Sequence, residues 1–295
     1  MTSTRRSARR RASLLLAGAV ALSGAGCTLI AGDDAPSTTS PVVPLQTTTT
    51  SEPPSSTSTA SGETPGTAPD ATTLVNAARD HMDTSANVTI SGTLHEAERD
   101  LMVRIHAEGS TGGLKSGQKD AGISRTTASL ADGGRLETII VGWDHFVKVD
   151  TAWLDGVGAP RDSPMRKHAG RWVKVPRENS PLDRYRPYQL LKQNFFGRGF
   201  TQFDARRSTV SIDTELVPGQ EAYRVALNKA GKQGRSTQRI LWVAAAPQPP
   251  EPLKLTYGRY PTRTTLVYSD WNASSEDFSE PRDATVVEDI SGEDL

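Results

Sequence analysis

The spacing of apolar residues changes once along the chain, and the change separates a helix from a long series of strands. The first apolar residues are spaced for one face of a helix: Leu74, Val75, Ala78 and Met82. Asp70 precedes them at the position of a helix N-cap. We therefore expect an amphipathic helix over residues 71–83. From Val88 onward apolar and polar residues alternate, which is the pattern of strands with two different faces.

The alternating pattern predicts about ten or eleven strands, most of them joined by short loops. They are expected at 88–94, 101–106, 123–130, 136–143, 146–149, 172–175, 209–214, 222–227, 239–244, 253–257 and 264–271. The polar link 96–100 makes the first two strands a hairpin. A second helix is expected after Pro187, ending at Gly197. These elements indicate an α+β protein with an antiparallel sheet.

Some of the predicted strands are apolar on both faces. Ile139, Ile140 and Val141 follow one another without a polar residue, so both sides of the sheet must be covered there. A sheet of this many strands tends to curl. We therefore expect two or three helices over the concave face of a curled sheet, and an acidic tail over 286–295.

The first residues of the chain indicate export and a lipid anchor. Five arginines precede an apolar run over 12–25, which is the pattern of a signal peptide and is too short for a stable membrane span. Residues 22–27 read Leu-Ser-Gly-Ala-Gly-Cys and resemble the lipobox of bacterial lipoproteins, with Gly24 where that pattern prefers Leu. The resemblance implies that residues 1–26 are removed and that Cys27 receives a diacylglyceryl group.

Composition describes the part between this anchor and the folded domain. Residues 27–70 are rich in Ser, Thr and Pro, contain no aromatic residue and cannot build a core, so we expect a disordered tether. The tether is either a plain spacer or a site of O-glycosylation. Five of the 34 basic residues lie in 1–26, so 29 remain against 34 acidic ones, a net charge of −5 that argues against nucleic-acid binding.

Three short segments resemble actinobacterial lipoproteins of the LppX and LprG type, and more distantly the LolA and LolB carriers. They are Val141–Val149 with Trp153, the run Gly-Arg-Trp-Val-Lys-Val-Pro at 170–176, and the C-terminal stretches 252–255 and 268–272 with Pro281. The similarity spans about 71–285. It implies a half-open β-barrel with helices over its concave face and an apolar cavity for acyl chains.

This resemblance defines the expected site. The cavity lining is predicted to include residues from the first helix and from the doubly apolar strands: Leu74, Met82, Ile139, Val141, Leu241 and Val243. Arginines of the middle segment are predicted at its mouth, because guanidinium pairs well with phosphate and carboxylate: Arg166, Arg184 and Arg186.

Two functions remain open after this reading. The protein is either a membrane-anchored, extracytoplasmic carrier or binder of an acylated envelope lipid or lipoglycan, or an accessory envelope lipoprotein that engages a protein or the wall without a lipid cargo. A measured cavity of several hundred Å³ would favour the first. We expect the protein to act as a monomer at the cell membrane.

Catalytic patterns are weak in this sequence, and we expect neither an enzyme nor a cofactor. Ser116 and Lys119 match a Ser-x-x-Lys motif but lie in a Gly-rich loop, without the companion motifs of penicillin-recognising enzymes. His95 and His106 are predicted on the polar face of the first hairpin without the partners of a zinc site. We therefore expect no metal ion.

Overall fold

The computed structural model describes residues 69–112, 114, 122–175, 184–197, 208–217, 220–229, 237–245, 248–273, 278–288 and 290. These residues belong to one compact unit, Glu63–Leu295. The predicted signal peptide, Cys27, the tether up to residue 68 and the Ser116–Lys119 motif lie outside the described residues and stay predictions.

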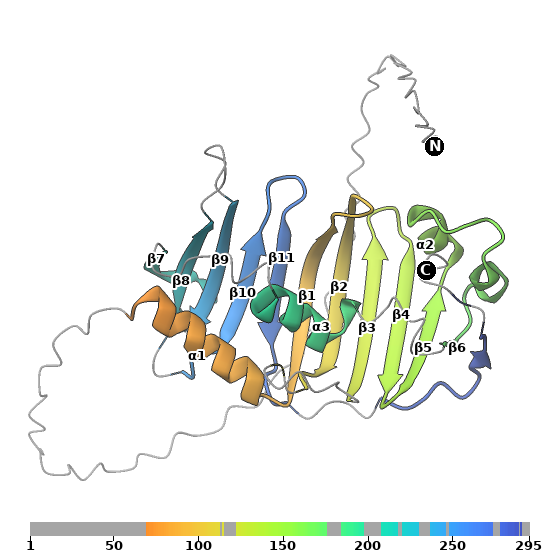
Figure 1. The fold of residues 1–295 in the computed structure, drawn as a ribbon, viewed down its shortest axis with the longest axis horizontal. Helices are drawn as coiled ribbons and strands as arrows, with labels where there is room; N and C mark the ends of the chain where they lie inside the picture. The colour runs from red at the N-terminus through yellow and green to blue at the C-terminus, as the bar shows by residue number, and fades with distance from the viewer. Residues whose placement is uncertain are drawn as a thin grey trace, which may run out of the picture. The chain divides into compact units, whose positions relative to one another are not determined.

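The core of the unit is one twelve-stranded sheet (Figure 1). Its strands are β1 (Asn87–Glu96), β2 (Leu101–Ser110), β3 (Ile123–Leu130), β4 (Arg135–Val141), β5 (Asp144–Val149), β6 (Val173–Val175), β7 (Thr209–Val217), β8 (Gln220–Lys229), β9 (Thr237–Ala244), β10 (Pro252–Tyr257), β11 (Thr264–Ser269) and β12 (Thr285–Val286). Their order in space is β12-β6-β5-β4-β3-β2-β1-β11-β10-β9-β8-β7, so the sheet keeps two edges and is curled but not closed. The expected α+β class with a curled antiparallel sheet is confirmed.

The sheet consists of two antiparallel meanders, β1–β6 and β7–β11, which meet in the middle. There β1 pairs with β11, with Ile90 opposite Tyr268 and Gly92 opposite Leu266. The described strands include one parallel pair, β12 with β6. The predicted first hairpin is confirmed, since β1 and β2 pair from Asn87 opposite Ser110 to Glu96 opposite Leu101.

Helices lie over one face of this sheet and beside its β5–β6 end (Figure 1). They are α1 (Ala71–Thr84), α2 (Thr151–Gly156), α3 (Pro187–Leu191) and the π-helical turn η4 (Lys192–Phe196), with a further 3-10 turn η1 (Pro164–His168). Asp70 caps α1 as predicted, accepting from the N–H groups of Thr72 and Thr73 at 2.8 and 3.1 Å. None of the helices in the described part of the chain has the length and apolar character needed to cross a bilayer.

The α2 helix was not predicted, although its start is well defined. Asp150 accepts a hydrogen bond from the Trp153 N–H at 2.7 Å and another from the Arg135 N–H at 3.1 Å. The helix ends at Gly156. It carries Trp153 and Leu154 into the core, both fully buried.

The second apolar face of β4 is covered by the C-terminal segment and not by a helix. Ile139 packs with Phe146 and Phe278, all three buried, and Val141 and Trp172 pack against them. The segment then forms β12, and Ile290 is buried in the main core. Residues 286–288 and 290, which the sequence predicts as part of an acidic tail, thus belong to the fold.

Candidate functional site

The helix-covered face of the sheet carries one continuous apolar cluster, which we call the inner layer. It contains the buried face of α1 and the aromatic residues of α2, α3 and η4. It also contains the inward residues of the ten neighbouring strands that run across the sheet from β6 at one end to β8 at the other. Ten strands at about 4.8 Å spacing make this layer about 43 Å wide. The inner layer is therefore wider, across the strands, than the length of any single described helix.

The helices above the inner layer are few and short. At about 1.5 Å per residue, α1 is about 21 Å long and α3 with η4 about 15 Å, and each is about 10 Å wide. These described helices cover about one third of the inner face of the strands, which are about 25 Å long.

The two main helical segments are tied to each other and to the sheet by arginines. Arg79 of α1 donates through Nε and Nη2 to the carbonyl oxygen of Phe195, at 3.1 and 2.8 Å. Arg239 of β9 donates through Nη1 to the carbonyl of Asn194 at 2.8 Å and lies over the ring of Tyr257 at 4.5 Å. Burial lowers the pKa of both guanidinium groups. The helices are thus fixed at a few points by polar contacts with backbone carbonyls.

Two polar groups in the inner layer have no hydrogen-bond partner among the described residues. They are the hydroxyl of Tyr268 and the indole N–H of Trp153, on side chains that are 3% and 0% exposed. Burial raises the pKa of Tyr268 well above its ordinary value. Buried polar groups are nearly always paired in native proteins, with protein groups or with ordered water.

A charged rim lies where β1 ends. The carboxylate of Glu96, with 9% of its side chain exposed, accepts a hydrogen bond from the Tyr185 hydroxyl and lies 3.4 Å from Nε of Arg184. Burial, reinforced by the negative charge of Glu96, raises the pKa of Tyr185, while Arg184 opposes this shift. Arg186 is itself buried, at 3% exposure.

The predicted mouth residues separate into two groups. Arg184 and Arg186 flank Tyr185, which is part of the inner layer. Arg166 instead pairs with Asp155 at 2.7 Å and donates to the carbonyls of Pro160 and Ala159, so it stabilises the loop around η1.

The predicted lining residues do not share one cluster. Leu74, Met82, Leu241 and Val243 are buried together in the inner layer. Ile139 and Val141 lie on the opposite face, against the C-terminal segment. The physical reason is strand alternation, because Ile140 of the same strand faces inward beside Leu136 and Thr138.

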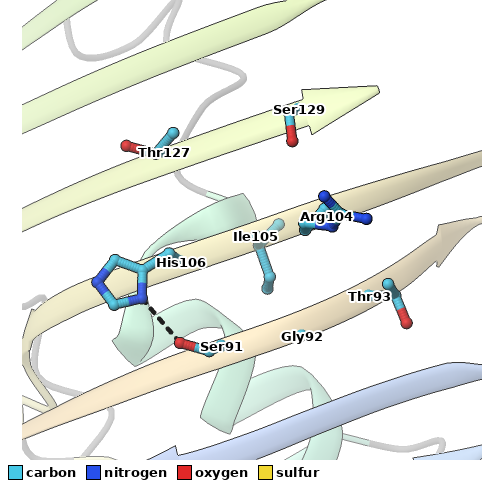
Figure 2. A pocket seen from close by; sticks show the side chains of 8 residues that line it. All are labelled: Ser91, Gly92, Thr93, Arg104, Ile105, His106, Thr127 and Ser129. Atoms are coloured by element: carbon cyan, nitrogen blue, oxygen red, sulfur yellow. Dashed lines mark hydrogen bonds between the residues drawn. The ribbon is translucent and has the colours of Figure 1, made fainter. Parts of the chain in front are cut away.

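The opposite, outer face of the sheet carries a hollow of about 380 Å³, which we call the outer groove (Figure 2). It crosses β1, β2 and β3 at the middle of the sheet. Its lining is Ser91, Gly92, Thr93, Arg104, Ile105, His106, Thr127 and Ser129. The polar side chains among these were expected on a solvated strand face, and their convergence was not predicted.

A hydroxyl and an imidazole of the outer groove stand in line with a carboxylate just beyond it. Ser91 Oγ lies 2.7 Å from Nδ1 of His106 (Figure 2), and His106 Nε2 lies 2.5 Å from Oε1 of Glu108. This order resembles a hydrolase relay. However, β1 is paired on both sides at Ser91, with Val267 and His106, so the backbone N–H groups needed for an oxyanion hole are engaged in the sheet. The geometry suits binding better than acyl transfer.

Groups of three or more residues suited to hold a metal ion are absent from the described part of the chain. Nε2 of His95 lies 3.0 Å from Oδ1 of Asp100, near the hairpin turn. In the β1–β2 register His95 is opposite Met102 and His106 is opposite Ser91, so the two histidines are not neighbours.

No protein-family model and no curated protein sequence matches the chain. Among solved structures, it is similar to LprF from Mycobacterium bovis, with 14% identity and a TM-score of 0.46 over 70% of this chain and 94% of the other. It is also similar to the Mycobacterium tuberculosis lipoprotein LppX, with 8% identity and a TM-score of 0.43 over 70% and 97%. MucB in its complex with MucA gives 13% identity and a TM-score of 0.32 over 74% and 61%. The expected resemblance to the LppX type is thus confirmed as a likeness, which says nothing about what this chain binds.

Proposed function

We propose that this protein is a lipoprotein, anchored to the outer side of the cell membrane through Cys27, that binds or carries an acylated envelope lipid or lipoglycan in its inner layer. The observation that carries the proposal is the inner layer itself: an apolar surface about 43 Å wide, of which α1 and α3 with η4 cover about a third. An acyl chain can displace these short helices without breaking the hydrogen bonds of the sheet.

The energy of such binding is sufficient. Burial of a methylene group contributes about 0.8 kcal/mol, so an acyl chain of about sixteen carbons could gain on the order of 10 kcal/mol before ordering costs. The unpartnered Tyr268 hydroxyl and Trp153 N–H would supply hydrogen bonds to polar atoms of the ligand. Arg184, half-buried at the rim, would face a phosphate or carboxylate near the headgroup.

Native mass spectrometry of residues 63–295, prepared from a lipid-containing host, tests the proposal. We expect a mass above that of the polypeptide, and loss of the excess on delipidation. Met82→Trp should reduce the bound lipid, because Met82 is fully buried between α1 and the sheet. Val267→Trp is the matched control, since Val267 is 44% exposed on the outer face.

The accessory alternative predicts a different result. If the inner layer only stabilises the fold, the unmodified chain shows the bare polypeptide mass and takes up no diacylated lipid on incubation. That outcome would favour a lipoprotein that engages a protein or the wall.

A further inference from the structure

The outer groove is built from two neighbouring rows of side chains across β1, β2 and β3. One row is Thr93, Arg104 and Ser129, and the other is Ser91, His106 and Thr127, each residue directly opposite the next. Directly opposed residues have Cβ atoms about 5 Å apart, and the rows are about 6.7 Å apart along the strands. We propose that this groove binds a phosphate monoester carried by a sugar or polyol.

Arg104 provides the phosphate subsite. The Arg104 side chain is exposed and forms no ion pair with the described residues. The hydroxyls of Thr93 and Ser129 stand on either side of it. Two guanidinium N–H groups and two hydroxyls can satisfy the three terminal oxygens of a phosphate monoester, whereas a carboxylate has only two oxygens to receive them.

The charges around Arg104 favour an anion there. Arg135 lies next to Ser129 in the same row, with its Nε 3.4 Å from Glu137, which also has Lys148 within 3.8 Å. Glu108 stands one row beyond His106 and is engaged with that imidazole. The carboxylates nearest the groove therefore already have basic partners, while the Arg104 guanidinium faces solvent.

The second row fits the hydroxyl groups of the sugar or polyol. Ser91 and Thr127 each offer a hydroxyl, and the imidazole of His106 between them contacts Ser91 (Figure 2). Its other ring nitrogen contacts Glu108. Such groups donate to and accept from neutral hydroxyls. A ligand with a phosphate group on Arg104 and hydroxyl groups on this second row would contact both rows of the outer groove.

The groove is rigid because it lies at the centre of the sheet, where β1 pairs with both β2 and β11. Gly92 forms part of its floor with φ +147°, and a Cβ there would come 2.0 Å from the carbonyl oxygen of Thr265. Only glycine fits this position. The two rows are thus presented by a fixed backbone, which lowers the ordering cost of binding.

Isothermal titration of the processed full chain in detergent with glucose 6-phosphate tests this inference. We expect saturable binding of glucose 6-phosphate, and weaker binding of inorganic phosphate and of glucose alone. Arg104→Gln should weaken binding about tenfold or more, because a hydrogen bond to a charged group is lost. Thr93→Val with Ser129→Ala should weaken it further, while Arg259→Gln, an exposed arginine in the β10–β11 hairpin, should leave it unchanged.

A second experiment distinguishes a lipid headgroup from a non-lipid ligand as the source of the phosphate. Vesicles of phosphatidylcholine, with or without phosphatidylinositol phosphate, are sedimented with the protein. Arg104-dependent binding to the doped vesicles alone would assign the groove to a lipid headgroup, and binding of glucose 6-phosphate alone to a soluble or wall-bound ligand. The proposal is overturned if the wild type binds neither, or if Arg104→Gln binds as the wild type does. Cargo in the inner layer should be unaffected by Arg104→Gln, so failure here leaves the lipid proposal standing.

Discussion

Replacement of Tyr268 by phenylalanine should stabilise the lipid-free protein. The Tyr268 hydroxyl is buried and has no hydrogen-bond partner among the described residues. Leaving such a group unsatisfied costs about 1–3 kcal/mol, and phenylalanine removes this cost. The ring contacts stay, because phenylalanine keeps the ring that lies 5.7 and 6.2 Å, between centroids, from the rings of Phe195 and Trp271. We therefore expect the free energy of unfolding to rise by about 1–3 kcal/mol.

The assay is urea unfolding followed by tryptophan fluorescence, with the slope against urea checked for constancy. Tyr257→Phe is the matched control, because Thr264 hydrogen-bonds the hydroxyl of Tyr257. That variant should lose about 0.5–1.5 kcal/mol. In protein that still carries lipid, the gain from Tyr268→Phe should shrink or reverse, since the ligand then provides the partner. A loss in the lipid-free protein as large as that of Tyr257→Phe would refute the reasoning.

Three further outcomes are expected. The protein should lose stability above about pH 10, because burial raises the pKa of Tyr185, Tyr257 and Tyr268 in the folded state, so that the unfolded chain binds fewer protons there. The free energy of unfolding, measured from about pH 9 to about pH 11, should fall by up to about 1.4 kcal/mol per pH unit for each tyrosine. A flat profile would contradict this expectation. Asp150→Ala should cost about 0.5–2 kcal/mol in urea unfolding through loss of the α2 cap, with Asp162→Ala, an exposed loop residue, as the unaffected control. Cys27→Ala should be released from membranes or remain uncleaved on fractionation, and a processed, membrane-retained variant would exclude the proposed anchor.

The sequence predicted the elements of this fold well, because alternation and caps are local signals. The start of α1 at Asp70 and the β1–β2 hairpin follow from residues close in the chain. The short β12 was missed, since two residues become a strand only by pairing with β6, far away in the sequence. Local patterns contain no such information.

The site was predicted less completely, for a related reason. Alternation separates Ile139 from Ile140 but does not say which of two apolar faces the helices cover, and in the structure Ile139 and Val141 lie on the face opposite the helices. The outer groove arises from residues on three strands whose register is set by the turns. Counting back from the predicted 96–100 turn would have placed Ser91 near His106, and this was the available signal.

Because β1 pairs with β11, the chain can complete the middle of the sheet only after β11 has been made. Synthesis begins at the N-terminus, so β1 to β6 are made long before β11 exists. During that interval β1 presents a row of unpaired backbone groups, to which another nascent chain could add. A chain truncated before Thr264 would keep this open edge permanently, and we expect such products to aggregate or be degraded instead of persisting as stable half-sheets.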